Sequence, residues 1–462
     1  MNNLLFIILF VFCGIDVFFI VRAICRGKRV FMQFIPSLGW LIAMVIPFMA
    51  QCYDLLPESI NMQAFGILLV GSLLLLGDAI RIKPLVHQDV LETSTGVPQA
   101  IYRFFTCENV YLIAFLALAV INLLSMDTIP LVYKLSHPEV DSATLSVLRA
   151  QSTKMLDVPL VFNYLFEWAS AFIAPAGIIL SFHKKKRLKG FIFLALALTY
   201  SLLTMAKGPI LLLAASLLLY YFLTIDFKIP KTAFIVIAVI VCLFGVRVTT
   251  FFAANPYSIF NLPDNTRFED TSFTVNSRET TYPDNFSSEY KAYNSIMYRS
   301  VLALPTCTNS WYRYPAAHND TFFGYSDLLP GTRTSENYVK PSQAVAKWDL
   351  NPKWPDAYPS YTYYNCGIDG DAYARGGVPA LIICALLLCG LRVLLKLLYI
   401  KDNILSKICY YLSIIQLGAL LASISLQAML LVRGMIGMLL LMLILVILSK
   451  VHQKQIANKK LP

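Results

Sequence analysis

The chain has 462 residues, of which 57% are hydrophobic and only 14% are charged. A soluble protein carries charge on about a quarter of its residues, so this composition excludes a soluble globular fold. The formal net charge of +11 would suit a nucleic-acid-binding protein, but the distribution of the basic residues along the chain favours a membrane protein instead.

Apolar blocks long enough to cross a bilayer, which takes roughly 17–25 residues, recur along the chain. We expect an all-α polytopic integral membrane protein with eleven transmembrane helices, at 3–21, 32–51, 62–80, 109–125, 160–182, 191–206, 208–225, 232–249, 376–395, 408–431 and 434–449. The first block lacks a preceding charged segment and a small-residue cleavage site, so a retained span is expected and not a signal peptide. The count is open by one at 191–225, where Lys207-Gly-Pro209 divides a long apolar run.

The basic residues predict the orientation of these spans. With the amino terminus outside, the cytoplasmic segments hold 22 of the 38 Lys and Arg residues, at 22–31, 81–108, 183–190, 226–231, 392–407 and 450–462. Such an excess is the positive-inside pattern of membrane proteins, and it predicts a cytoplasmic carboxyl terminus. The run from Lys184 to Arg187 is then expected to lie beside anionic lipid.

This orientation divides the chain into three parts. Residues 1–249 form an N-terminal transmembrane bundle with a short outer loop at 126–158, residues 250–375 form a large periplasmic loop, and residues 376–462 form a C-terminal transmembrane bundle with a basic tail. Structureless loops of this length are uncommon. We therefore expect the large loop to fold into short helices packed over the bundle.

The large loop is rich in aromatic residues, with 14 of the 25 tyrosines and three of the five tryptophans. Flat rings stack on the apolar faces of pyranoses while polar groups orient the hydroxyls, so the composition suits sugar or lipid-headgroup recognition. The alternative is the belt of Tyr and Trp at a membrane interface. Belt residues cluster at span ends, whereas many of these, such as Trp311, lie in the middle of the loop.

Cys307 and Cys366 are the two cysteines of the large loop. An oxidising compartment would permit a disulfide between them. The sequence leaves open whether their Cα atoms lie close enough for one.

Motifs for nucleotides, catalytic zinc, thiol redox chemistry and serine hydrolysis are absent, so no cofactor is expected. Asp369-Gly-Asp371 has the form of a metal-binding acidic pair. A turn capped by Asp and Gly just before the ninth span is the favoured interpretation, and no metal site is expected.

The informative residues are cations on the predicted outer side, where the positive-inside pattern disfavours them. They are Arg149, Lys154, Lys207, Arg247, Arg299, Arg375 and Arg433, with Arg313 in the large loop. Ionisable residues at membrane depth are functional candidates, and Arg grips a phosphate bidentately. For any one residue, snorkelling or a structural pair, for example with Glu167 or Asp157, is an equal explanation. For the set we expect a shared anionic ligand.

Several local patterns follow one another in a fixed order. They are Ser146-Val-Leu-Arg149, the basic turn from His183 to Lys189, Ala206-Lys-Gly-Pro209, Tyr298-Arg-Ser-Val-Leu-Ala-Leu-Pro305, Asn365, and Tyr373-Ala-Arg-Gly-Gly-Val378. In layout and in the order of these patterns, the chain from about residue 109 to 449 resembles the bacterial O-antigen polymerases, the Wzy type of oligosaccharide repeat-unit polymerase. One departure is Lys207, which stands where Arg is commoner and lacks its fork.

The resemblance implies a glycosyltransferase of lipopolysaccharide or surface polysaccharide biosynthesis in the bacterial inner membrane. Its substrate would be an undecaprenyl-pyrophosphate-linked oligosaccharide, and the growing glycan would pass to an incoming lipid-linked repeat unit at the periplasmic face. No nucleotide sugar is required, because pyrophosphate is the leaving group. The partners implied are membrane lipids, a chain-length regulator and a flippase of the same pathway, with no nucleic acid.

This chemistry needs cations that stabilise the departing pyrophosphate and a base that takes the proton of the acceptor hydroxyl. The candidate catalytic residues are Arg299, Arg149, Lys207, His318 and Asp320, and the candidate substrate-binding residues are Arg247, Arg433, Arg313, Arg375, Trp311 and Tyr298. His318 is the candidate base and Asp320 the alternative to it. A surface histidine without a role remains the slightly favoured interpretation of His318.

Two other functions compete with the polymerase. An O-antigen ligase transfers the glycan to lipid A-core, and His318-Asn319 loosely fits the His-Asn element of ligases, although 56 residues separate it from the next predicted span at 376. A non-enzymatic flippase or exporter of the same lipid-linked oligosaccharide commonly has two related halves, and we find no such halves in this sequence.

Overall fold

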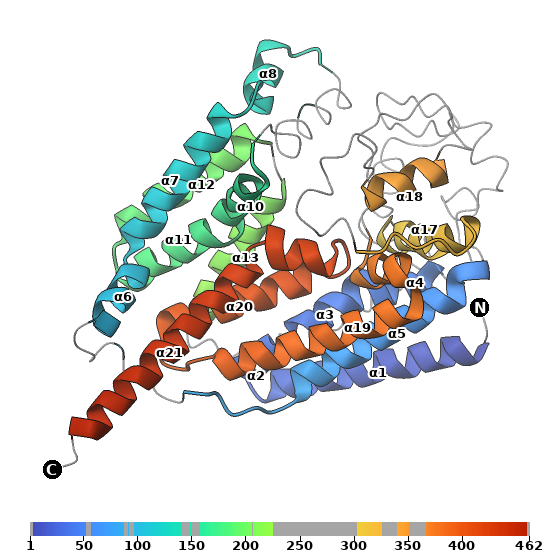
Figure 1. Ribbon diagram of the computed structural model, residues 1–462, viewed down its shortest axis with the longest axis horizontal. Coiled ribbons are helices and arrows are strands. Elements are labelled where there is room, and N and C mark those ends of the chain that lie inside the picture. The colour runs from blue at the N-terminus through green and yellow to red at the C-terminus, as the bar shows by residue number, and fades with distance from the viewer. Residues whose placement is uncertain are drawn as a thin grey trace. The chain divides into compact units, whose positions relative to one another are not determined.

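The computed structural model describes residues 3–51, 57–86, 97–140, 158–205, 207–224, 303–325, 340–350 and 366–459, with residues 91 and 148 in isolation. Every regular element in these ranges is a helix (Figure 1), which confirms the all-α prediction for this part of the chain. Within it, five helices are long and apolar enough to cross a membrane, or six if one bent pair counts as a single span. These are the features of a helical membrane protein.

The helices are α1 (Asn3–Cys25), α2 (Lys28–Gln33), α3 (Ile35–Trp40), η1 (Leu41–Val45), α4 (Ile46–Gln51), α5 (Pro57–Ala79), α6 (Val97–Thr106), α7 (Glu108–Leu124), α8 (Pro130–Ser136), α10 (Leu160–Trp168), η2 (Ala169–Ile173), α11 (Ala174–His183), α12 (Arg187–Leu203), α13 (Lys207–Thr224), α17 (Ala303–Ala317), α18 (Pro341–Leu350), α19 (Ile368–Leu398), α20 (Ile404–Leu420), η6 (Ala428–Val432) and α21 (Met435–Lys459). The three elements named η are π-helical. Helical residues lie at each predicted span except 232–249, which is outside the described residues.

The structure differs from the predicted spans at two places. The predicted span 408–431 is interrupted, because α20 ends at Leu420 and a turn separates it from η6. The acidic pair at 369–371 is the first turn of α19 and not a loop turn, a position where carboxylates complement the helix dipole. α19 then kinks at Gly376 and Gly377, so its apolar part begins where the ninth span was predicted.

Contacts divide the chain into two units. Unit 1 comprises Met1–Val30, Trp40–Leu69 and Ile225–Ile382, and unit 2 comprises Phe31–Gly39, Val70–Thr224 and Ile383–Pro462. The division falls within α2, α3, α5 and α19, each of which supplies residues to both units.

In unit 1, α17 packs against η1, α4 and α18. A polar network fastens it to α5: Asn309 donates to Ser59 Oγ (2.9 Å) and Gln63 Oε1 (2.8 Å), and Gln63 donates to the carbonyl of Pro305 (2.9 Å). Gly66 permits the close approach, because a Cβ there would lie 1.9 Å from the hydroxyl of Tyr312.

In unit 2, α11 packs against α7 and α12, and α20 packs against α21 (Figure 1). A buried ion pair joins α5 to α19: Asp78 binds Arg392 and accepts hydrogen bonds from Ser37 N (3.2 Å) and Ser37 Oγ (2.7 Å). Lys396 donates to the carbonyls of Gly77, Asp78 and Ile80 at 2.6–2.8 Å. It thereby caps the carboxyl end of α5, whose last carbonyls have no partner within the helix.

Candidate functional site

The described parts of the predicted large loop gather with the start of α19 in unit 1. The predicted site residues found there are Trp311, Arg313, His318, Asp320 and Arg375. We call the four rings of Tyr314, His318, Phe323 and Trp348 the aromatic cluster.

The aromatic cluster holds His318 in one orientation. The ring of Tyr314 stacks on His318 (centroids 3.9 Å apart) and on Phe323 (4.7 Å), and Trp348 of α18 meets Tyr314 edge-on at 5.5 Å. His318 Nδ1 lies 2.8 Å from the carbonyl oxygen of Tyr314. A carbonyl oxygen only accepts, so Nδ1 carries the hydrogen, and in the neutral ring Nε2 has the basic lone pair.

Asp320, the alternative base, lies on the turn that ends α17. Asn319 and Asp320 both adopt the left-handed conformation, with φ of 53° and 54°, which Asn and Asp tolerate better than other non-glycine residues. The amides of His318 and Asp320 donate to the carbonyl of Pro315 at 3.0 and 2.8 Å. Asp320 is exposed, and its charge is close enough to act on Tyr373.

The guanidinium group of Arg313 lies over the ring of Trp348, 5.3 Å from its centroid. This cation–π contact links α17 to α18 at the edge of the aromatic cluster.

Arg375 fastens the segment after α17 to α19. Its Nε donates to both carboxylate oxygens of Asp371 at 3.0 Å, and its Nη1 donates to the carbonyl of Gly324 at 3.1 Å. The amides of Phe323 and Gly324 donate to the carbonyls of Ala374 and Arg375, each at 3.0 Å. These are carbonyls that the kink in α19 deprives of helical partners. The Asp371 carboxylate is thus occupied by an arginine.

Trp311 was expected to stack on sugar, but it is a core residue with only 2% of its surface exposed. It packs with Val345, Cys366 and Ala374, so neither ring face is presented at the surface. Val345 of α18 and Ala374 of α19 are distant from Trp311 in sequence, and position along the loop does not reveal such contacts.

Asp369, at the start of α19, is fully buried. The hydroxyl of Tyr312 donates to its Oδ2 at 3.1 Å, and the Tyr312 ring stacks on Tyr373 with centroids 4.7 Å apart. Burial, reinforced by the Asp369 charge, holds the pKa of Tyr312 well above its usual value. Tyr312 therefore remains a hydrogen-bond donor over the physiological pH range.

Cys307 and Cys366 lie near one another as two thiols. The residues that follow them, Thr308 and Gly367, are joined by a hydrogen bond, in which the amide of Gly367 donates to Thr308 Oγ1 at 3.0 Å. Burial, followed by the charges of Asp371 and Asp369, raises the pKa of Cys366 well above its usual value.

Arg433 lies in unit 2 and pairs with Glu167, one of the two acidic residues that the sequence suggested as structural partners. Its Nη1 lies 2.6 Å from Glu167 Oε2, with 23% and 31% of the two side chains exposed. Glu167 lies two residues before η2, and Arg433 directly follows η6. π-Helical turns are frequent at functional sites.

Trp168 and Gln416 fix the chain around this pair. The indole of Trp168 donates to the carbonyl of Leu431 at 2.6 Å, and its ring packs against Gly434, which has φ of 77°. Gln416 donates to the carbonyls of Ala171 and Arg433, both at 3.1 Å.

The remaining predicted residues are not described. Arg149, Arg247, Tyr298 and Arg299 lie outside the described residues, and of Lys207 only its place at the start of α13 is described. The three predicted cations whose side chains are described, Arg313, Arg375 and Arg433, each have a partner within the chain.

Sequence reasoning did not single out Tyr312 or the Asp78–Arg392 pair, and it interpreted Asp369 as part of a capped turn. The sequence signal for the ion pair was weak, because Asp78 and Arg392 lie at span ends and were counted as cytoplasmic. Within the described ranges, no group of three or more His, Cys, Asp or Glu side chains is arranged to hold a metal ion.

Comparison of the chain with protein-family models, with curated proteins and with solved structures gives no match in any of the three.

Proposed function

We propose that this chain is an O-antigen or surface polysaccharide polymerase of the bacterial inner membrane. It transfers a growing glycan from undecaprenyl pyrophosphate to an incoming lipid-linked repeat unit at the periplasmic face. Two observations support this function, the resemblance in sequence layout and the arrangement of the aromatic cluster around His318.

The observation that carries the proposal is the environment of His318. A half-buried imidazole, stacked on Tyr314 and oriented by a backbone carbonyl, is prepared to accept a proton at Nε2. The rings around it supply flat apolar surface of the kind that binds sugars.

The reaction assigns a task to each kind of residue. The acceptor hydroxyl attacks the anomeric carbon, the bond from that carbon to the pyrophosphate oxygen breaks, and His318 takes the hydroxyl proton. The negative charge that remains on the pyrophosphate is stabilised by cations. We assign this role first to Arg299, then to Arg149 and Lys207, with Arg247 and Arg433 as docking groups.

A ligase is the competing function, because His318-Asn319 loosely fits its His-Asn element. The phenotypes of strains separate the two functions. A deletion strain that makes lipopolysaccharide capped with single repeat units supports the polymerase. Uncapped core together with accumulated lipid-linked polymer would identify a ligase instead.

Complementation of that strain tests His318 itself. His318→Gln should abolish long chains while single repeat units persist, and Arg299→Ala should do the same. His137→Gln is a matched control, because His137 also stacks on a tyrosine four residues earlier, Tyr133, at 4.4 Å, but lies at the exposed end of α8. A normal ladder from His318→Gln would exclude His318 as the base.

A further inference from the structure

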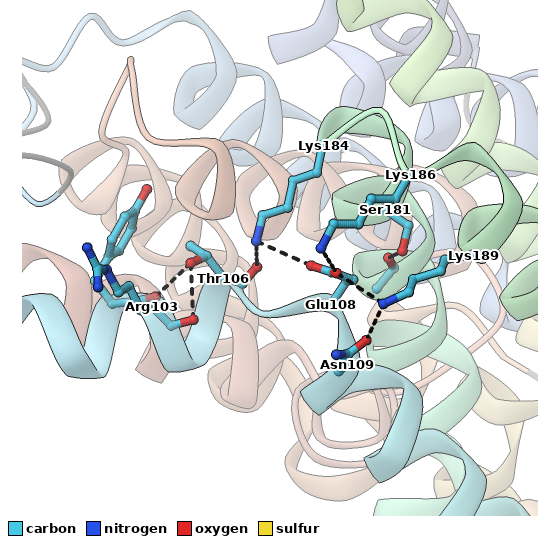
Figure 2. A network of polar contacts seen from close by, with 10 residues as sticks. Arg103, Thr106, Glu108, Asn109, Ser181, Lys184, Lys186 and Lys189 are labelled. Carbon is cyan, nitrogen blue, oxygen red and sulfur yellow. Dashed lines mark hydrogen bonds and ion pairs between the residues drawn. The ribbon is translucent and has the colours of Figure 1, made fainter.

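Within unit 2, the buried carboxylate of Glu108 gathers three lysines (Figure 2). Glu108, the first residue of α7, has only 3% of its side chain exposed, and it pairs with Lys184 (3.3 Å), Lys186 and Lys189 (3.9 Å). Lys189 also donates to Asn109 Oδ1 at 3.2 Å. Lys184 and Lys186 lie in the turn between α11 and α12, and Lys189 lies in the first turn of α12, so Glu108 holds this segment against α7.

The turn carries far more positive charge than Glu108 offsets. The three lysines remain 35–47% exposed, and Lys185 and Arg187 between them are exposed as well. The hydrogen bond from Lys186 to Glu108 raises the pKa of Lys186, so this lysine stays cationic. We call residues 184–189 the basic turn.

Helix α6 contacts the basic turn. Lys184 donates to the carbonyl of Thr106 at 2.7 Å, which ties the end of α6 to the basic turn (Figure 2). The axes of α6 and α7 differ in direction by 57°. At about 1.5 Å per residue, the length of α7 alone is close to the thickness of the hydrocarbon core of a bilayer. α6 buries Tyr102 and exposes Arg103 and Phe104, the two-faced pattern of a helix lying in the membrane interface.

Exposed apolar side chains lie directly beside these cations. Leu188 within the basic turn is 75% exposed, Phe191 in the next turn of α12 is 59% exposed, and Phe104 of α6 is 56% exposed. Positive groups next to apolar surface match a molecule with an anionic head and hydrocarbon chains.

We propose that the basic turn and α6 bind an anionic phospholipid, with the headgroup phosphate on the lysines and the acyl chains along Leu188, Phe191 and Phe104. Glu108 organises this site: it fixes three lysines together and leaves their excess charge to the lipid. The site is independent of the proposed glycan transfer and lies on the side predicted to be cytoplasmic.

Lipid titration of the purified, delipidated full-length protein tests the proposal. Lys185→Gln together with Arg187→Gln removes two charges without touching the lysines that hold Glu108. Binding of phosphatidylglycerol should weaken at least about tenfold, since each surface cation contributes roughly a fivefold gain. Phosphatidylcholine binding should not change. Lys401→Gln together with Lys450→Gln is the matched control of equal charge.

Unchanged phosphatidylglycerol affinity in the Lys185/Arg187 variant would overturn the proposal, as would an equal loss in the control. Phosphatidylglycerol and phosphatidylcholine bound equally by the unmodified protein would also overturn it, and would leave an acidic protein partner as the explanation of the charge. A glycan ladder measured for the same variants separates the two claims, because lipid binding can fail while chain extension persists, and the reverse.

Discussion

Replacing Asp78 by Ala should destabilise the protein by about 3–5 kcal/mol, the range for removing one partner of a buried ion pair. Arg392 is 0% exposed and would keep its charge without a carboxylate, next to Lys396, which is 7% exposed. The substitution also removes the acceptor of two hydrogen bonds from Ser37. The Glu167–Arg433 pair is partly exposed, so Glu167→Ala should cost only about 0–1 kcal/mol.

These effects can be ranked by heating the purified variants in detergent and measuring the temperature at which the monodisperse fraction of each is lost. Asp78→Ala should unfold at a distinctly lower temperature than Glu167→Ala. The double variant Asp78→Leu with Arg392→Met should recover most of the loss, because an apolar pair removes the uncompensated charge. If Asp78→Ala unfolds at the same temperature as Glu167→Ala, the assigned role of the buried pair is wrong.

Two further predictions concern unit 1. Gly66→Ala should destabilise the protein by about 1–3 kcal/mol through overpacking against Tyr312, whereas Gly390→Ala, with nothing within 4 Å of the new Cβ, should not; equal melting temperatures of the two variants would contradict this. We also propose that, in an oxidising periplasm, thiol–disulfide exchange with a protein disulfide joins Cys307 to Cys366 and reduces that protein to a dithiol. Mass spectrometry of protein trapped with an alkylating agent should find the linked peptides in the unmodified chain and not in Cys307→Ser. Two alkylated thiols would refute the bridge.

Hydropathy predicted the positions of most helices because a block such as that in α1 or α5 has one stable environment, the bilayer. It did not predict the π-helical turns η2 and η6, or the segment of α19 before its kink, because these depend on packing partners far along the chain. The positive-inside count placed Arg392 among the basic residues of a span end and carried no information on its burial or on its pairing with Asp78.

The candidate site was predictable by residue type and not by geometry. His318 was singled out as the one histidine of the large loop. The features that favour it as a base, the stacking on Tyr314 and the hydrogen bond at Nδ1, arise only when α17 forms and brings the two residues to one face. Trp311 illustrates the converse, since an aromatic residue in mid-loop suggested a surface platform although its neighbours in α18 and α19 bury it.

Glycan extension by the purified protein, reconstituted in vesicles with isolated lipid-linked repeat units, is the most direct test of the proposed activity. We predict a ladder of lengthening lipid-linked chains with release of undecaprenyl pyrophosphate, and loss of that ladder with His318→Gln. Repeat units that never lengthen, or that only cross the vesicle membrane, would contradict the polymerase.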